Sequence, residues 1–328
     1  MRLLVTGATG FVGARLAIRA AREGHRVAGL GRNASAELRA TFAQHEVELR
    51  LGDINDPVFV DDAISRSTHV CHLAAAWREV GLPIEHYRHV NVDGTRNVAL
   101  AAARHGLSKL VFCSTIGLHP RRSKEVITEE SRFDLTNPYE ESKAETEDLL
   151  RAIARDTGLS IAMLRPADVY GPGDLRLLKL FRAVARQRFP LVGPGTGRRH
   201  MLHIDDLTGA LLMACVQASG PCEAFIIAGP DVVTLRALLE QLTKLLAVRR
   251  FGFRVPFGPM KALAAVIEDV CGMIGVTPPI HRRSLDFFLT DVEYDTRKAR
   301  SKLHWTPLVS LDSGLRQTIE WYRREQLL

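Results

Sequence analysis

Short apolar runs alternate along the chain with longer segments in which apolar residues recur every three or four positions. The runs predict buried parallel strands, and the periodic segments predict helices with one apolar face. This alternation begins at the first residues and predicts an α/β fold with a doubly wound parallel sheet. The seven expected strands are residues 3–5, 25–30, 47–51, 69–73, 110–113, 160–164 and 224–228.

A glycine set follows the first expected strand. Gly7, Gly10 and Gly13 stand at spacings of three, and the first helix begins among them. Residues without a β-carbon let the backbone approach a pyrophosphate, and a helix N-terminus offers it free N–H groups and a partial positive charge. The set predicts a dinucleotide site, although this stretch alone also fits a glycine-rich turn without a ligand.

The residues that close the second strand bear on which dinucleotide binds. An acid there would accept hydrogen bonds from the adenosine ribose and repel a 2′-phosphate, whereas a small residue followed by Arg does the opposite. Gly31 and Arg32 therefore favour NADP(H), with NAD(H) possible, unless Arg32 is only a loop cation. Asp53 is a candidate for bonding the adenine amino group.

Composition excludes several classes of function. The chain has 328 residues, of which 46% are hydrophobic and 25% charged, and a net charge of +7 without a basic run, so no nucleic-acid partner is expected. Five scattered cysteines lack a C-x-x-C pair, which predicts no metal site and a reducing compartment. No signal peptide is recognisable, and Lys261 interrupts the apolar stretch 255–276, so a cytoplasmic location without membrane partners is expected.

Two residues of the predicted helix after residue 137 suggest acid–base chemistry. Tyr139 and Lys143 are four apart and so share one helical face. A phenol has an unperturbed pKa near 10, and a neighbouring ammonium favours the phenolate. Such a pair is a proton donor for a carbonyl oxygen, but by itself the spacing is common and usually structural.

The order of motifs resembles the extended short-chain dehydrogenase/reductase family, also called the NAD-dependent epimerase/dehydratase family. The resemblance runs from Met1 to about Arg324. The matching motifs include Gly7-x-x-Gly10-x-x-Gly13, Gly52-Asp53, His72-Leu73-Ala74, Asn91-Val92-Asp93-Gly94-Thr95, Ser114-Thr115, Tyr139-x-x-x-Lys143, Arg165-Pro166, Tyr170-Gly171-Pro172-Gly173-Asp174 and His203-Ile204-Asp205-Asp206-Leu207.

This resemblance implies a role for each catalytic residue. Tyr139 would be the general acid/base, Lys143 would bond the nicotinamide ribose and lower the pKa of Tyr139, and Thr115 would hold the substrate oxygen, a task that Ser114 could share. The expected cofactor contacts are Gly7, Thr9, Gly10, Phe11, Val12, Arg32, Asp53, Ile54, Leu73, Ala74, Ala75, Asn91, Ser114, Tyr139, Lys143, Pro166 and Val169.

The resemblance also implies the domain organisation. A Rossmann domain is expected from residues 1–167, rejoined by 198–233, with a smaller, mostly helical substrate-binding cap from 168–197 and 234–328. A homodimer is expected, because helices such as 87–103 and 139–155 commonly pair between subunits of this family.

Departures from the family pattern bear on the substrate. Ile116 and Gly117 stand where sugar-nucleotide dehydratases have an acid pair, which argues against dehydration. Asp168 replaces an Asn near the diphosphate of many epimerases and would repel it, whereas Arg199 stands where epimerases place a diphosphate-binding Arg or is a surface cation. The expected substrate contacts are Trp77, Thr115, Ile116, His119, Asp168 and Arg199.

The leading hypothesis is a secondary alcohol/ketone oxidoreductase of the hydroxysteroid-dehydrogenase-like branch, acting on a small, fairly apolar molecule. The segment with Pro278, Pro279, Arg282 and Arg283 favours that branch. The alternatives are a nucleotide-sugar 4-epimerase with tightly bound NAD(P) and a non-catalytic dinucleotide sensor. Sensors of this kind usually lose the Tyr or the Lys of the catalytic pair, and this chain has both.

Overall fold

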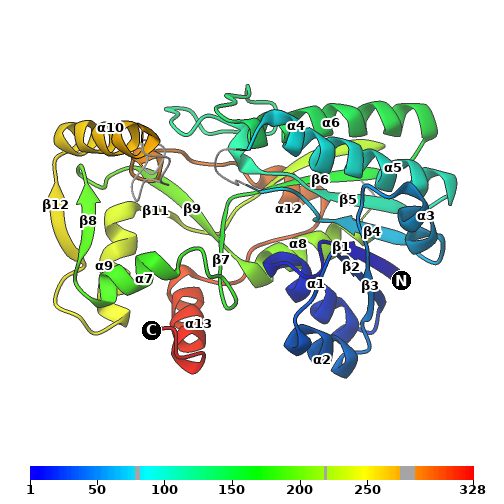
Figure 1. Ribbon diagram of the computed structural model, residues 1–328, viewed down its shortest axis with the longest axis horizontal. Coiled ribbons are helices and arrows are strands. Elements are labelled where there is room, and N and C mark those ends of the chain that lie inside the picture. The colour runs from blue at the N-terminus through cyan, green and yellow to red at the C-terminus, as the bar shows by residue number, and fades with distance from the viewer. Residues whose placement is uncertain (78–81, 218–219, 274–284) are drawn as a thin grey trace.

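Seven parallel strands form the central sheet of the structure, which is a computed structural model (Figure 1). Their order is β10-β6-β5-β4-β1-β2-β3, so the chain winds outward from β1 in both directions and the sheet is doubly wound, as predicted. The strands are β1 (Arg2–Thr6), β2 (Arg26–Gly31), β3 (Glu48–Leu51), β4 (His69–His72), β5 (Lys109–Cys113), β6 (Ile161–Pro166) and β10 (Cys222–Ile227). Each overlaps one of the seven apolar runs.

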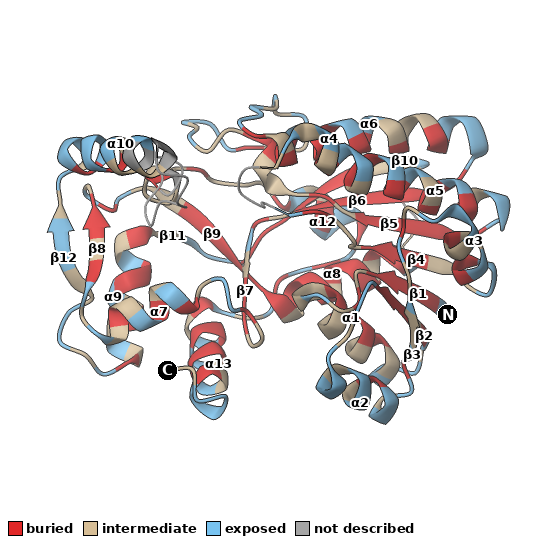
Figure 2. Cartoon of the chain, viewed as in Figure 1, coloured by how far each residue is buried: buried red, intermediate tan, exposed pale blue. Residues whose placement is uncertain are grey.

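Helices cover both faces of this sheet, which explains why the strands are apolar on both sides (Figures 1 and 2). One face carries α1 (Phe11–Arg22), α2 (Ala36–Gln44), α8 (Ile204–Val216) and α12 (Arg297–Lys302). The other face carries α3 (Pro57–Ser65), α5 (Gly94–Arg104) and α6 (Pro138–Thr157).

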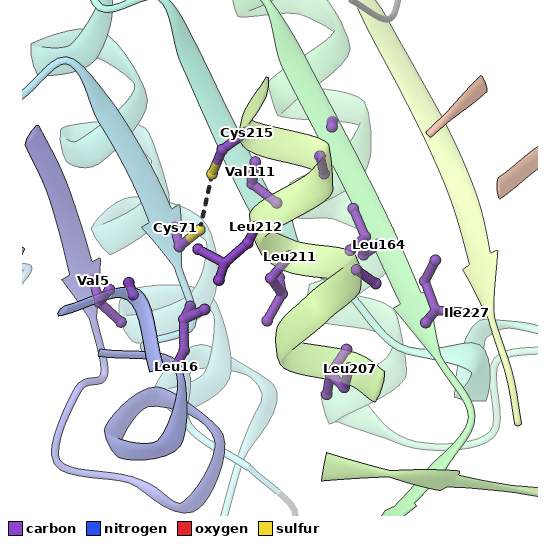
Figure 3. Close-up of a cluster of buried hydrophobic side chains, with 14 of the residues drawn as sticks. Val5, Leu16, Cys71, Val111, Leu164, Leu207, Leu211, Leu212, Cys215 and Ile227 are labelled. Carbon is purple, nitrogen blue, oxygen red and sulfur yellow. Dashed lines mark hydrogen bonds between the residues drawn. The ribbon is translucent and has the colours of Figure 1, made fainter. Parts of the chain in front are cut away.

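The core beneath α8 shows how tightly one of these faces is packed (Figure 3). Leu207 and Leu211 of α8 are completely buried, and burying a leucine side chain contributes about 1.5–3 kcal/mol. Cys71 on β4 and Cys215 on α8 lie with their sulfur atoms 3.4 Å apart. The hydrogen bond with Cys215 and burial raise the pKa of Cys71, so this pair contributes to packing as thiols.

The expected long helix over 85–103 is divided into three pieces. α4 (Ile84–Tyr87) leads into a π-helical turn, η1 (Arg88–Asp93), and α5 follows. A β-carbon at Gly94 would lie 2.5 Å from Cδ1 of Ile54, which is the packing reason for a glycine within the helix. Such π-helical turns often occur at functional sites.

A second group of elements lies beside the sheet (Figure 1). It holds a three-stranded sheet, a two-stranded sheet and several helices around two apolar clusters. Its strands are β7 (Asp168–Tyr170), β8 (Phe189–Val192), β9 (Arg198–His203), β11 (Val232–Thr234) and β12 (Gly252–Val255). Its helices are α7 (Leu178–Ala185), α9 (Leu235–Leu245), α10 (Phe257–Met273), α11 (Asp286–Leu289) and α13 (Leu311–Arg324).

The C-terminal part of the chain contributes to both groups. Ala299 and Leu303 of α12, with Trp305, pack into the core of the large sheet, while α13 packs in the second group. The division into a Rossmann domain and a cap remains a prediction.

The structure describes residues 1–77, 82–217, 220–273 and 285–328. The segment with Pro278, Pro279, Arg282 and Arg283 lies outside them. Within these ranges no helix is both long enough and apolar enough to span a membrane. Across the same ranges, His, Cys, Asp and Glu side chains form no group of three or more that would suit a metal ion.

Candidate active site

The glycine loop connects β1 to α1 and packs directly against the loop after β4. Gly7 has a φ of +68°, and a β-carbon there would lie 2.7 Å from the backbone nitrogen of Ala74. A β-carbon at Gly13 would lie 2.1 Å from the carbonyl oxygen of Gly7. Both glycines are therefore required by backbone contacts within the protein.

Gly10 differs, because the nearest atom to a β-carbon there is the Gly7 oxygen at 3.4 Å. Gly10 is also the N-cap of α1, where no side chain accepts a hydrogen bond from the first turn, and the first turn contains no acid. The first-turn N–H groups are thus available to an anion. The open space at Gly10 and these N–H groups fit the pyrophosphate of a dinucleotide.

The expected adenosine contacts lie at the ends of β2 and β3. Arg32 is exposed, and no residue within the described ranges accepts a hydrogen bond from it. A β-carbon at Gly31 would lie 2.5 Å from Cγ2 of Thr9, so packing also requires a glycine at the end of β2. Asp53 is exposed and accepts hydrogen bonds from the backbone and side chain of Asn55, while Ile54 is buried.

Buried polar groups fix the loop after β4. The Thr6 hydroxyl accepts the N–H groups of Leu73 and Ala74, both at 3.2 Å. His72 contacts Thr6 through Nδ1 at 2.6 Å and Thr95 through Nε2 at 2.8 Å. Burial, with a smaller effect of the Lys143 charge, lowers the pKa of His72 to about 3, so this imidazole stays neutral.

Asn91 joins that loop to α6. Its side-chain oxygen accepts the N–H of Ala76 at 2.8 Å, and its nitrogen donates to the Ala76 carbonyl and to the Ser142 hydroxyl. Asn91 is 1% exposed, and its amide is used by these contacts. Its role is therefore to position the backbone around Ala76 rather than to present an amide to a ligand.

Tyr139 and Lys143 lie on the first turns of α6, which begins with Asn137 as N-cap and Pro138 in the first turn. Tyr139 is 5% exposed and packs against Ala76 and Tyr87. Beside it, the π-helical turn η1 contacts α6.

The Lys143 ammonium donates to the carbonyl of Cys113 at 2.9 Å and lies 4.3 Å from the centre of the Phe112 ring. Burial lowers the pKa of Lys143 to about 8, whereas charges of nearby acidic groups oppose this shift. The side chain therefore remains mostly protonated at neutral pH, as its expected role requires.

The two hydroxyls after β5 have different partners. Ser114 is buried and donates to Oε1 of Glu147 at 2.7 Å. Thr115 is half-buried, and its oxygen accepts the N–H of Gly117 at the start of the short 3-10 helix η2 (Ile116–Leu118). Thr115 thus retains a hydroxyl proton that can be donated to a substrate oxygen, whereas the proton of Ser114 is committed to Glu147.

A buried ion pair that the sequence analysis did not identify lies behind these residues. Glu147 is one turn after Lys143 on α6, and its oxygens accept from Arg165 at 2.9 and 2.7 Å and from Arg151 at 2.9 Å. Glu147 and Arg165 are 0% and 1% exposed. Two features of the sequence could have revealed this ion pair. An acid stands four residues after Lys143, and the arginine belongs to the Arg165-Pro166 motif.

His119, an expected substrate contact, is part of this network. It is 2% exposed, and its Nε2 lies 3.1 Å from Nη1 of Arg165, while its ring packs edge-on against Phe133. Burial and the Arg165 charge lower its pKa to about 4. His119 therefore lies beside Arg165 in a buried network rather than at an open surface.

The other expected substrate contacts have contrasting environments. Trp77 is 45% exposed, Asp168 is exposed, and Ile116 is half-buried. Arg199 is 1% exposed, donates to the carbonyl of Phe287 at 2.7 Å and stacks on the Phe287 ring. Burial lowers the pKa of Arg199, and the charge of Asp168 opposes this shift, so Asp168 acts as its counter-charge. Arg199 is thus not a surface cation.

Comparison with known proteins shows the family and the fold of this chain. The sequence model of the NAD dependent epimerase/dehydratase family matches residues 3–228. A 2-alkyl-3-oxoalkanoate reductase of Stenotrophomonas maltophilia is 30% identical over 97% of this chain and 98% of that protein. A dTDP-glucose 4,6-dehydratase of Streptomyces niveus is 28% identical over 98% and 93%. The crystal structure of a UDP-glucose 4-epimerase of Thermotoga maritima shares the fold, with a TM-score of 0.80 and 24% identity over 99% and 100% of the two chains.

We predict that Glu147→Gln lowers the free energy of unfolding by about 3–5 kcal/mol at pH 7, because it leaves the Arg165 guanidinium buried without a counter-charge. The control is Asp148→Asn, whose side chain is 80% exposed and also pairs with Arg151, and we expect it to change stability by about 0.5 kcal/mol or less. Urea unfolding measures both variants. Equal changes in the free energy of unfolding of the two variants would contradict the importance of the buried Glu147–Arg165 pair.

The loss of stability in Glu147→Gln should depend on pH. Burial raises the pKa of Glu147, but Arg165 and Ser114 outweigh burial and hold it below the usual value of 4.5. The stabilisation is therefore present above pH 4.5 and is lost as the pH falls through the lowered folded-state pKa. Urea unfolding should therefore show that the difference in the free energy of unfolding between wild type and Glu147→Gln becomes smaller below pH 4.5.

Proposed function

The chain belongs to the NAD dependent epimerase/dehydratase family, and we propose that it is an NADP(H)-preferring oxidoreductase that interconverts a secondary alcohol and a ketone on a small, fairly apolar substrate. The observation that carries this proposal is the closed environment of Arg199. The similarity to the Stenotrophomonas reductase over nearly the whole length of both chains supports the same reaction class.

The proposed chemistry assigns one task to each residue. When bound, the nicotinamide donates or accepts the hydride. In the reductive direction, the Tyr139 hydroxyl donates its proton to the carbonyl oxygen of the substrate, and in the oxidative direction it accepts the alcohol proton. The Lys143 ammonium favours the phenolate form of Tyr139 and bonds the nicotinamide ribose. The Thr115 hydroxyl holds the substrate oxygen.

The charges near the substrate site favour an apolar ketone over a sugar nucleotide. A diphosphate needs accessible cations, but Arg199 is buried and already bonded to the Phe287 carbonyl. Asp168 is an exposed carboxylate on the same small sheet and would repel a diphosphate by about 1 kcal/mol or more. Exposed Trp77 offers an apolar surface instead.

A nucleotide-sugar 4-epimerase is the second candidate. Arg199 occupies the position at which epimerases of this family bind the diphosphate, and Nε of Arg199 has no hydrogen-bond partner among the described residues. An epimerase would retain its nucleotide through purification and would turn over UDP-glucose without added cofactor. A carbonyl panel with added NADPH, run beside a sugar-nucleotide assay without cofactor, separates the two candidates.

We predict that Tyr139→Phe abolishes turnover, lowering kcat by 100-fold or more, because the proton donor of the carbonyl oxygen is removed. The Kd for NADPH, measured by calorimetry, should stay within about twofold of wild type, since the ring that packs against Ala76 and Tyr87 is retained. Unchanged turnover would remove Tyr139 from the mechanism.

We predict that Arg32→Ser weakens NADPH binding about tenfold or more and leaves NADH binding unchanged, because only NADPH has the 2′-phosphate that Arg32 would contact. Calorimetric titration with both nucleotides, after assay of the purified protein for nucleotide already bound, measures this. If NAD is found tightly bound, the interpretation of Arg32 is wrong and epimerisation becomes the leading candidate.

We also propose a homodimer formed through the helices around Tyr87 and Tyr139, as the family resemblance implies. Light scattering during size exclusion should then give twice the chain mass of 36.4 kDa, whereas the monomer mass would reject the dimer. A cytoplasmic location and a small-molecule substrate, without nucleic-acid or membrane partners, remain expectations.

A further inference from the structure

Arg176 joins three parts of the chain at the glycine loop. Its guanidinium carbon lies 5.3 Å from the centre of the Phe11 ring and 5.4 Å from the centre of the Trp77 ring. Phe11 is the first residue of α1, and Trp77 lies in the loop after β4. Arg176 itself follows β7, and a β-carbon at Gly173 in the same loop would lie 3.3 Å from the Phe11 ring.

Asp174 holds this arginine in a fixed plane. Its carboxylate accepts from Nε at 2.8 Å and from Nη2 at 3.1 Å, and the carbonyl of Val169 also accepts from Nη2 at 2.8 Å. Asp174 is 1% exposed, and its own carbonyl accepts the Tyr322 hydroxyl of α13. The position of Arg176 is therefore set in advance by a buried carboxylate rather than by solvent contacts.

The guanidinium nevertheless retains a donor group. Nη1 of Arg176 has no acceptor among the residues that the structure describes, and the side chain is 41% exposed. The buried Arg165 differs, because it donates from all three of its nitrogens and is 1% exposed. A partly open guanidinium with one nitrogen that has no partner among the described residues is available to a ligand.

The place of Arg176 identifies that ligand. A dinucleotide whose pyrophosphate lies at Gly10 and whose nicotinamide lies at Tyr139 and Lys143 would pass the loop after β4, of which residues 73–77 are described. Since the guanidinium carbon of Arg176 lies within 5.4 Å of the centres of both the Phe11 and the Trp77 rings, it lies beside this path. The nearby N-terminus of α1 has no acid in its first turn, so the pyrophosphate would meet only positive partners on these two sides.

We propose that Arg176 is a cofactor-binding residue that crosses the dinucleotide and pairs with its pyrophosphate through Nη1. This inference rests on the dinucleotide binding of the proposed function. The hydrogen bonds to Asp174 and Val169 hold the guanidinium in position, and a planar fork suits phosphate oxygens better than an ammonium does.

The test is Arg176→Gln, titrated with NADPH and with NADH by calorimetry. We expect the Kd for both nucleotides to rise by the same factor, about tenfold or more, because they share the pyrophosphate. The control is Arg316→Gln, which removes an arginine that also pairs with an aspartate, Asp312, on the exposed side of α13. The control should leave both affinities unchanged.

A double variant distinguishes direct pairing from a side effect. Arg176→Gln leaves the Asp174 carboxylate without its counter-charge, and that carboxylate could itself repel a phosphate. Asp174→Asn combined with Arg176→Gln removes both charges, and thermal unfolding checks that the loop remains folded. Direct pairing predicts that the double variant still binds both nucleotides weakly. Recovery of wild-type affinity in the double variant would overturn the proposal.

Three other outcomes can be distinguished from one another. Wild-type affinity in Arg176→Gln would show that Arg176 only joins its loop to Phe11 and Trp77, and would overturn the inference while leaving the proposed function intact. Failure of the unaltered protein to bind either nucleotide would overturn the proposed function, and the inference with it. Weakening of NADPH alone would assign the effect to the 2′-phosphate and would also contradict pairing with the pyrophosphate.

Discussion

The close backbone contact between Gly7 and the loop after β4 is the constraint on which the rest of the candidate site depends. A single β-carbon at Gly7 would fall 2.7 Å from the Ala74 nitrogen, so the two loops can meet only because this position lacks one. Their contact aligns the end of β1, the start of α1 and residues 73–77 after β4. The N-terminus of α1 and the backbone after β4 are thereby held at a fixed separation.

A second set of buried contacts fixes the helix that carries Tyr139 and Lys143, the residues predicted to be catalytic. Asn91 bonds both Ala76 and Ser142, and Glu147 bonds both Ser114 and Arg165, so α6 is tied to the loops after β4 and β5. Because these groups are buried and fully bonded, a shift of one would leave others without partners. The position of the half-buried Thr115 follows from that rigidity.

The sequence allowed the strands, the glycine loop and the Tyr139–Lys143 face to be predicted, because each depends on local periodicity or on spacing within one segment. The π-helical turn was not predicted, since the same apolar stripe fits an unbroken helix. The burial of Arg199 and the pairing of Glu147 with Arg165 were also missed, because these contacts join segments far apart in the chain. Asn91 was assigned to the cofactor by resemblance, whereas its amide is bonded to Ala76 and Ser142.

The hydrogen bond between Tyr322 and Asp174 spans 148 positions of the chain. The large sheet is complete once β10 has been synthesised, but the loop that carries Asp174 obtains this anchor only after residue 322 has left the ribosome. The order of assembly therefore differs from the order of synthesis, as for any contact of high sequence separation. During translation, the glycine loop can form well before the loop that lies over it becomes fixed.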